Sequence, residues 1–538
     1  MKVDFFLATI ILSAVPVLSA AQSNERFSDF EKARTEKLQA FKNRQEQAMA
    51  EFKAERNAAY ELMLRRKWVW MQAHSAVKAP DINPVRPIEM PEEDKIKPVV
   101  PNPQPIDGLL PKRKPSPAPE PVVIDGDVPD DYPYVMVCTD YACCPVRLDK
   151  TKLPHLQSSD ESAVADFWRR MSSDDFNPML SDLLGIRDEF SLCDWQLANI
   201  LKEFAAAVYP ERNDRILLRA FILTQFGYDV RLGRDNSDDL YLFLATDICL
   251  VNAAYYTINN VRYYDIDCAS SGSIWIVAGE FTGTLPMRFI PEHPICLAEK
   301  PSEPRTLASE FYRNAKADVS VNLSLIELYD NYPQGYFGND YETFYAYLAS
   351  FPMDETVVRT LYPALNASLE GKNELDKVEI ILNFVQTAFE YKTDIEACGV
   401  SNRGFYPEET LYYPYSDCED RAVLFSRLVR DLVGLPVALV LYPRHLAAAV
   451  AFRDGAHGDY VKCDGTIYTI TDPTYINAGV GRTMPGMENE SAFVMILWAD
   501  LSSPDCRSLK AVLRLLFINY LSLTDRLECF RNICGKIC

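Results

Sequence analysis

The fold of this chain is decided where an acidic turn runs into an apolar helix, in the stretch Ser416-Asp417-Cys418-Glu419-Asp420-Arg421-Ala422. Apolar residues then recur at intervals of three and four as far as Leu432, and Gly434 and Pro436 end the pattern. This spacing predicts a helix that begins at Cys418. The cysteine therefore lies in the first turn, where free backbone N–H groups and the positive end of the helix dipole favour a thiolate.

Three strands are predicted after this helix. Val437–Tyr442 has the composition of a buried strand, and His445 stands at the start of a second strand that runs to Phe452. A third strand around Tyr468-Thr469-Ile470 leads into Asp472. Neighbouring strand ends can bring a base and an orienting carboxylate together opposite a nucleophile on a helix. We therefore expect Cys418, His445 and Asp472 to form a catalytic triad.

The three motifs, in this order, resemble the Cys, His and Asp boxes of the transglutaminase-like superfamily over roughly residues 376 to 476. The resemblance implies an α+β, papain-like core, in which Cys418 attacks an amide carbonyl, His445 shuttles the proton and Asp472 orients the imidazole. Family members cross-link, cleave or deamidate amides, and some are inactive. Asp417 before the cysteine and Leu446-Ala447 after the histidine depart from the common pattern and leave the substrate open.

The chemistry of the cysteine carries a further expectation. Next to a helix N-terminus and an imidazole, Cys418 is predicted to be an accessible thiol of unusually low pKa. His457 is the rival base, but it lies in a loop between glycines. No glycine-rich phosphate loop and no paired metal-binding histidines are visible, so neither a cofactor nor a metal is expected.

The N-terminus predicts export. Residues 1–21 combine an early lysine, a short apolar run and small residues before the expected cleavage site, which is the order of a signal peptide. The apolar run is shorter than the ~20 residues of a membrane-spanning helix, and no later segment is long enough. We therefore expect a periplasmic or secreted protein with no transmembrane segment. The net charge of −21 excludes a general nucleic-acid binder.

The segment 22–78 predicts one long helix, because residues 24–74 contain neither glycine nor proline. Its apolar anchors recur every eleven residues, at Phe30, Phe41, Phe52 and Met63. Such a stripe suits a coiled coil and a homo-oligomer formed through residues 24–74. The alternative is an amphipathic helix that folds against its own chain or a membrane surface. A proline-rich linker, predicted to be a semi-rigid spacer, follows at 79–133.

The segment 134–300 has the pattern of a degenerate copy of the catalytic domain, or of an accessory domain. Residues 193–268 can be aligned with 398–476 as the same helix-then-strands unit. In that alignment the places of the triad are taken by non-catalytic residues, namely Arg212, Asp239 and Cys268. The catalytic domain itself spans 301–538, with an apolar helix predicted near its C-terminus.

Fourteen cysteines are compatible with disulfides in an exported chain. Two groups, Cys138/Cys143/Cys144 and Cys529/Cys534/Cys538, lack the histidines and spacing of a metal site, so disulfides or buried thiols are the plainer interpretation.

Two functions follow from these patterns. In the first, the protein is a secreted thiol-dependent acyltransferase or hydrolase that acts on peptide or protein amides, a transglutaminase-like cysteine acyltransferase or peptidase. In the second, it is a catalytically inactive binding or assembly protein that keeps the enzyme fold.

Overall fold

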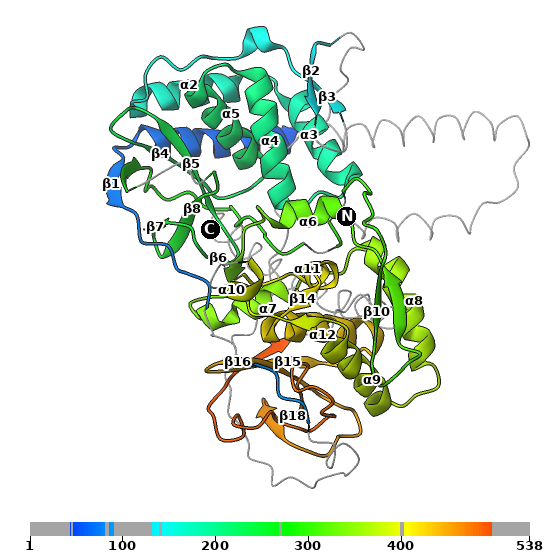
Figure 1. Ribbon diagram of the computed structural model, residues 1–538. Helices are drawn as coiled ribbons and strands as arrows, with labels where there is room; N and C mark the ends of the chain where they lie inside the picture. Colours follow the sequence, from blue (N-terminus) through cyan, green and yellow to red (C-terminus); the bar gives the residue numbers. More distant parts are fainter. Residues whose placement is uncertain are drawn as a thin grey trace, which may run out of the picture.

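The computed structural model describes residues 44, 47–80, 86–90, 132–138, 143–267, 272–291, 293–295, 297–398 and 403–497. Their architecture is α+β, in two units that Figure 1 shows stacked one above the other. The predicted signal peptide, most of the linker, the C-terminal helix, Cys268 and the Cys529/Cys534/Cys538 group lie outside the described residues.

The first unit is a six-stranded antiparallel sheet covered by helices. The sheet order is β1-β9-β4-β5-β8-β7, with bounds β1 Val69–Gln72, β4 Val230–Arg234, β5 Leu240–Ala245, β7 Tyr255–Ile258, β8 Val261–Asp265 and β9 Ser273–Ile276. The covering helices are α2 Glu161–Ser173, α3 Asn177–Glu189, α4 Asp194–Val208 and α5 Arg212–Gln225. A hairpin of β2 Tyr134–Cys138 and β3 Cys143–Arg147 precedes them.

The second unit places a five-stranded antiparallel sheet against a long buried helix. The order is β17-β18-β16-β15-β19, with bounds β15 Val437–Tyr442, β16 His445–Val450, β17 Tyr460–Cys463, β18 Thr466–Thr471 and β19 Phe493–Leu497. The helices are α6 Leu323–Tyr329, α7 Phe344–Leu348, α8 Glu355–Leu369, α9 Glu374–Thr387, α10 Asp394–Cys398, α11 Pro407–Tyr412 and α12 Cys418–Leu432. The helix predicted from Cys418 and the strands predicted after it are confirmed; β17 was not predicted.

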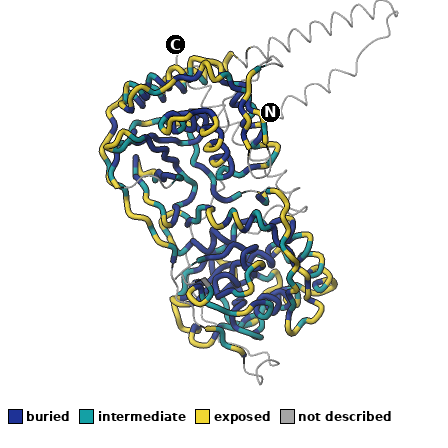
Figure 2. The backbone as a smooth tube through the Cα atoms, turned by 45° about the horizontal axis from the view of Figure 1, so that its top comes forward, coloured by how far each residue is buried: buried dark blue, intermediate teal, exposed yellow. Residues whose placement is uncertain are grey.

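Short strand pairs complete the second unit and join it to the first. β10 Arg305–Ala308 pairs with β11 Lys316–Val319, and β13 Glu390–Tyr391 pairs in parallel with β14 Tyr415–Ser416. β6 Cys249–Leu250 of the first unit pairs with β12 Gly335–Tyr336 of the second. One apolar core runs through both units, and the buried stretches of backbone in Figure 2 gather in the interior of each.

The two sheets share one topology. Each begins after a long helix with a strand pair (β4–β5 or β15–β16), continues with a hairpin (β7–β8 or β17–β18) that pairs with the second strand, and returns to pair with the first strand (β9 or β19). Both long helices end at a glycine with positive φ, Gly227 at 92° and Gly434 at 72°, a conformation that glycine adopts without strain. The predicted helix-then-sheet correspondence is confirmed in strand order.

The long N-terminal helix ends earlier than predicted. Helix continues over 47–65, and the chain then forms β1, which pairs with β9 from Val69 opposite Ile276. The prediction of helix to residue 74 is therefore wrong, because Trp68 and its β-branched and aromatic neighbours find a sheet edge to extend.

The described part of this helix packs against its own chain, the alternative left open by the sequence. Tyr60 is fully buried and donates its hydroxyl to the Val230 carbonyl at 3.1 Å, and Met63 is 2% exposed. Asn57 and Gln225 form a buried pair of side-chain amides at 2.8 Å. Phe52, by contrast, is 51% exposed, so the stripe of apolar anchors is divided. Phe30 and Phe41 lie outside the described residues.

Part of the proline-rich linker is attached to the second unit. Residues 86–90 run parallel to the segment after β18, where the N–H of Met90 donates to the Ile476 carbonyl at 2.9 Å. Met90 is 5% exposed among apolar side chains beneath the second sheet. The prediction of a plain spacer is wrong here, because two ladder hydrogen bonds and a buried methionine fix the segment.

Two observations bear on the cysteines and on membranes. Cys138 and Cys143 form a disulfide across the β2–β3 hairpin, and Cys144 stays a free, half-buried thiol. In the part of the chain that is described, no helix has both the length and the apolar character needed to cross a bilayer.

Candidate active site

Cys418 is the first residue of α12 and a free thiol. Asp417 precedes it, and its backbone N–H donates to the side chain of Asp420 at 3.2 Å in the first turn of the helix. The Cys418 side chain is fully buried and donates its S–H to Glu419 Oε2, with 3.0 Å between sulfur and oxygen. The backbone N–H of Leu446, the residue after His445, also hydrogen-bonds the Cys418 sulfur.

His445 and Asp472 form a buried dyad. His445 is the first residue of β16, opposite Tyr442 of β15, and Asp472 follows the last residue of β18. His445 Nε2 and Asp472 Oδ2 are 2.7 Å apart, and the two side chains are 0% and 1% exposed. The other carboxylate oxygen accepts the Thr474 backbone N–H at 2.9 Å. The carboxylate is thus held in place and accepts a hydrogen bond from the Nε2–H group of the imidazole.

The turn that carries Asp472 is fixed by α9. The side-chain amide of Gln386 donates to the backbone carbonyls of Asp472, Tyr475 and Ala478 at 2.8 to 3.0 Å. Gln386 is 1% exposed. A buried amide that satisfies three carbonyls keeps the turn rigid, so the orientation of the imidazole is set by a helix that sequence analysis did not assign to the site.

The three predicted residues lie on neighbouring elements, since α12 packs against β16 and β16 pairs with β18, but hydrogen bonds do not join all of them. His445 Nδ1 is buried and has no hydrogen-bond partner among the described residues. The thiol of Cys418 turns to Glu419, and no hydrogen bond links it to His445. With Nε2 engaged by Asp472, Nδ1 is the ring nitrogen left to accept a proton.

The prediction of an accessible, acidic thiol is wrong. Burial raises the pKa of Cys418 above its ordinary value, and the neighbouring carboxyl groups of Glu419 and Asp417 raise it further. The Leu446 N–H acts in the opposite direction but is outweighed. Sequence reasoning credited the helix N-terminus and left out the desolvation and the acidic neighbours, which disfavour a second negative charge.

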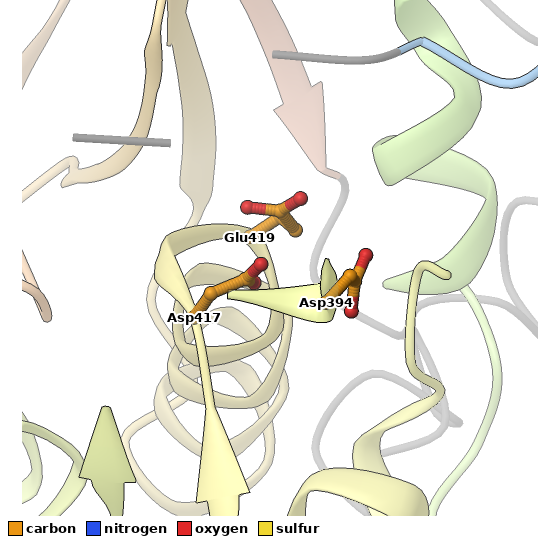
Figure 3. Close-up of side chains that lie close together, drawn as sticks. All are labelled: Asp394, Asp417 and Glu419. Carbon is orange, nitrogen blue, oxygen red and sulfur yellow. The ribbon is translucent and has the colours of Figure 1, made fainter. Parts of the chain in front are cut away.

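Three carboxylates converge beside the thiol. Asp394, at the start of α10, lies with Asp417 and Glu419 so that one ligand oxygen of each is within 4.8 Å of the others, and all three are buried (Figure 3). We call them the carboxylate trio. Burial raises the pKa of Glu419 to about 7 and that of Asp417 above its usual range. Asp417 and Glu419 flank Cys418 in the sequence, but no sequence signal connects Asp394 to them.

The rival base lies apart from this site. His457 is exposed in the loop between β16 and β17, and exposure to water leaves it without the fixed partner that orients a catalytic imidazole. Of the two histidines, His445 is the one whose neighbour in the chain, Leu446, contacts the Cys418 thiol through its backbone N–H.

The first unit carries no triad at the equivalent positions, and its register corrects part of the sequence alignment. Arg212 is the first residue of α5, as predicted. Leu240 begins β5 opposite the last residue of β4, as His445 begins β16, so Leu240 rather than Asp239 takes the histidine's place. Asp265 pairs with Phe243 as Thr471 pairs with Ala448, which puts Ile266 rather than Cys268 at the aspartate's position.

These corrections have a simple cause. The alignment of the sequences allowed slack in the loops, whereas a strand register is fixed by hydrogen bonds and moves every side chain to the other face when it slips by one residue.

A comparison of the chain with models of known protein families finds no match, and neither does a search of curated proteins.

Proposed function

We propose that the protein is a thiol-dependent acyltransferase or hydrolase of peptide or protein amides, with Cys418 as nucleophile, His445 as base and Asp472 as the group that orients the imidazole. The observation that carries the proposal is the buried His445–Asp472 dyad, 2.7 Å between Nε2 and Oδ2, whose second ring nitrogen is left unpaired. A buried nitrogen without a partner is costly, and a proton-accepting role gives it a purpose. The motif resemblance to transglutaminase-like proteins supports the same assignment.

The proposed reaction has two steps. Cys418 Sγ attacks the amide carbonyl carbon while His445 Nδ1 takes the thiol proton, and collapse of the tetrahedral adduct breaks the C–N bond as the imidazolium protonates the departing amine. Water or a second amine then attacks the thioester carbonyl carbon, with His445 again the base. The C–S bond breaks, and the departing Cys418 thiolate takes the proton back from the imidazolium. The first step requires the thiol to exchange its contact with Glu419 for one with His445.

The experiment is reaction of the folded protein with an electrophilic thiol probe, followed by peptide mapping. We expect Cys418 to be labelled faster than Cys463, a second buried free thiol of the same unit, and expect His445→Ala to slow labelling of Cys418 alone. Cys463→Ala is the matched control and should leave the rate at Cys418 unchanged. Equal labelling of both thiols, or no effect of His445→Ala, would reject the proposal.

The same protein allows hydrolysis and transfer to be separated. Peptide amides are incubated with and without a fluorescent primary amine. Label joined to the peptide identifies acyl transfer, and release of the free acid identifies hydrolysis.

A second function has its own observation. Cys418 is fully buried and bonded to a carboxyl group, the state expected of a thiol that serves packing rather than catalysis. In this case the protein is an inactive binding or assembly protein that retains the fold. Failure of Cys418 to react in the first experiment, with a folded protein, selects this function.

Export and self-association remain proposals as well. We propose that residues 1–21 are removed during secretion, which N-terminal sequencing of the mature protein tests. Self-association through residues 24–74 is tested by sizing the intact protein beside a Phe52→Asp variant, because Phe52 is exposed and its replacement spares the core. An unchanged oligomeric size of the variant would show that Phe52 does not lie in an interface between copies.

A further inference from the structure

We propose that the carboxylate trio, Asp394, Asp417 and Glu419, is a binding site for a hard divalent cation such as Ca²⁺ or Mn²⁺, next to the candidate nucleophile. The sequence predicted no metal, because it shows no paired metal-binding histidines, and Asp394 is distant along the chain from Asp417 and Glu419. The proposal is independent of the proposed catalytic function.

Convergence is the first observation. The three carboxylates come from two elements, the start of α10 and the start of α12, and one oxygen from each lies within 4.8 Å of the other two. Figure 3 shows the three side chains close together, with Asp417 and Glu419 at the start of α12. Oxygens this close to one another can contact one ion.

The state of Asp417 is the second observation. It is 1% exposed, and neither of its carboxylate oxygens has a hydrogen-bond partner. In the capping box of α12 the Asp420 N–H faces the Asp417 side chain, but no hydrogen bond of normal geometry forms there. The Asp420 carboxylate, in contrast, receives the N–H groups of Asp417 and Phe405. A buried carboxylate without donors costs several kcal/mol unless a positive charge or a proton joins it.

No ion pair joins a basic side chain of the described residues to Asp417 or Glu419, although Arg421 attracts Asp417 at longer range. The nearest guanidinium, that of Arg421, directs its donors to Ser416 Oγ and to the carbonyls of Gln386 and Phe389. Glu419 receives the Cys418 thiol, and Asp394 accepts the Arg403 backbone N–H. The negative charge gathered by three neighbouring buried carboxylates would be neutralised by a bound cation.

The donor set decides the class of ion. Three carboxylates and no imidazole favour hard cations over Zn²⁺ or Cu²⁺. The trio supplies up to six oxygens, which suits Ca²⁺ or Mn²⁺, whereas Mg²⁺ keeps several waters that a buried site excludes. A cation bound here competes with the Cys418 thiol for the carboxylate of Glu419, which accepts the S–H group in the metal-free protein.

The site is tested with Tb³⁺, a luminescent ion that replaces hard divalent cations. Tyr345 and Tyr391 lie near the trio, because the charges of Asp417 and Glu419 add to burial in raising the pKa of both phenols. Both rings can therefore sensitise Tb³⁺ emission. The intact protein, freed of metal with a chelator, is titrated with Tb³⁺, and Ca²⁺, Mn²⁺, Mg²⁺ and Zn²⁺ are then added as competitors. We expect one saturable site per chain that Ca²⁺ or Mn²⁺ displaces.

Isosteric variants locate the site. Asp394→Asn and Asp417→Asn should each weaken Tb³⁺ binding by about tenfold or more, whereas Glu408→Gln, a buried carboxyl in α11, should leave it unchanged. Because Asp417→Asn removes an uncompensated buried charge, the metal-free variant should melt no lower than the parent, and the rise in melting temperature caused by Ca²⁺ or Mn²⁺ in the parent should disappear. Absence of saturable binding, equal binding by parent and both trio variants, or preferential displacement by Zn²⁺ would overturn the proposal.

Discussion

The two long helices, α5 in the first unit and α12 in the second, stand in the same place against sheets of the same strand order, and their N-termini differ. In the first unit the Arg212 guanidinium donates to the Leu240 carbonyl at 2.6 Å and lies 4.7 Å from the centre of the Tyr241 ring. In the second, Cys418 replaces the arginine, and the strand opposite begins with His445 instead of Leu240.

The difference teaches how a shared scaffold separates stability from chemistry. At the N-terminus of α5 the polar groups satisfy one another, since Asn213 also accepts the Leu240 N–H at 2.9 Å. At the N-terminus of α12, Asp417 and His445 Nδ1 are buried and unpaired. Buried polar groups without partners carry a cost that calls for an explanation, and for this reason we propose that the second helix N-terminus is the functional one.

The sharpest test of this comparison is replacement of the first residue of each helix. Cys418→Ala should lower amide turnover by a thousandfold or more, about the loss expected for a nucleophile, whereas Arg212→Ala should leave turnover within about twofold. The measurement is kcat on one peptide amide. An unchanged kcat in Cys418→Ala would show that the two helix N-termini do not differ in the way proposed.

Within the second unit, the dyad is expected to give a graded loss. His445→Ala should cost nearly as much kcat as Cys418→Ala, because both the base and the later proton donor are lost. Asp472→Asn should cost less, since the imidazole stays and only its orientation weakens. A larger loss for Asp472→Asn than for His445→Ala would contradict the assigned roles.

A pH effect on stability is expected from the second unit. Glu408, fully buried in α11, accepts the Asp354 N–H at 2.8 Å and the Tyr329 hydroxyl at 3.2 Å, and burial raises its pKa from 4.5 to about 7. Its contribution is complete below about pH 4.5, where the folded and unfolded chains are both protonated. Between about pH 4.5 and 7 the unfolded chain ionises first, so this contribution is lost as pH rises.

Glu408→Gln should remove that dependence and stabilise the protein at pH 8 by up to about 3 kcal/mol. Urea unfolding of parent and variant at pH 5 and pH 8 measures it. Glu374→Gln, an acid that pairs with Arg453 at the surface, is the control and should change the pH dependence little. The free energy of unfolding of Glu408→Gln should exceed that of the parent by more at pH 8 than at pH 5. An equal or smaller difference at pH 8 would contradict the assigned pKa.

The smallest effect belongs to the helix N-terminus of the first unit. Arg212 is 41% exposed, and Arg212→Ala removes its hydrogen bonds to the Leu240 carbonyl and to Asn213 Oδ1, its ion pair with Asp239 at 3.6 Å and one cation–π contact. The loss should be about 1 kcal/mol, read from the urea midpoint, and Arg212→Lys should recover only part of it because lysine lacks the planar fork. A loss above about 3 kcal/mol would mean that this helix start is as critical to the fold as a buried core residue.

Local patterns in the sequence were sufficient for α12 and for the strands β15, β16 and β18 of the second unit. Apolar spacing and Gly434 defined α12, and an apolar run defined β15 at its observed bounds. His445 and Asp472 could be chosen because each stands at the end of such an element. These features depend on residues within one turn or one strand, where periodicity and glycine conformation act directly.

The tertiary structure alone decided the chemistry around them. Burial of Cys418, the approach of Asp394, the support of Gln386 and the strand register that replaces Asp239 by Leu240 all depend on contacts between distant segments. The end of the N-terminal helix at residue 65 was decided in the same way, because the edge of a sheet offered β1 hydrogen bonds that no local pattern encodes. The sequence by itself indicated Cys418, His445 and Asp472 as candidates. Packing added Asp394 and Gln386 and determined the charge, exposure and partners of all five, since these depend on which groups are desolvated together.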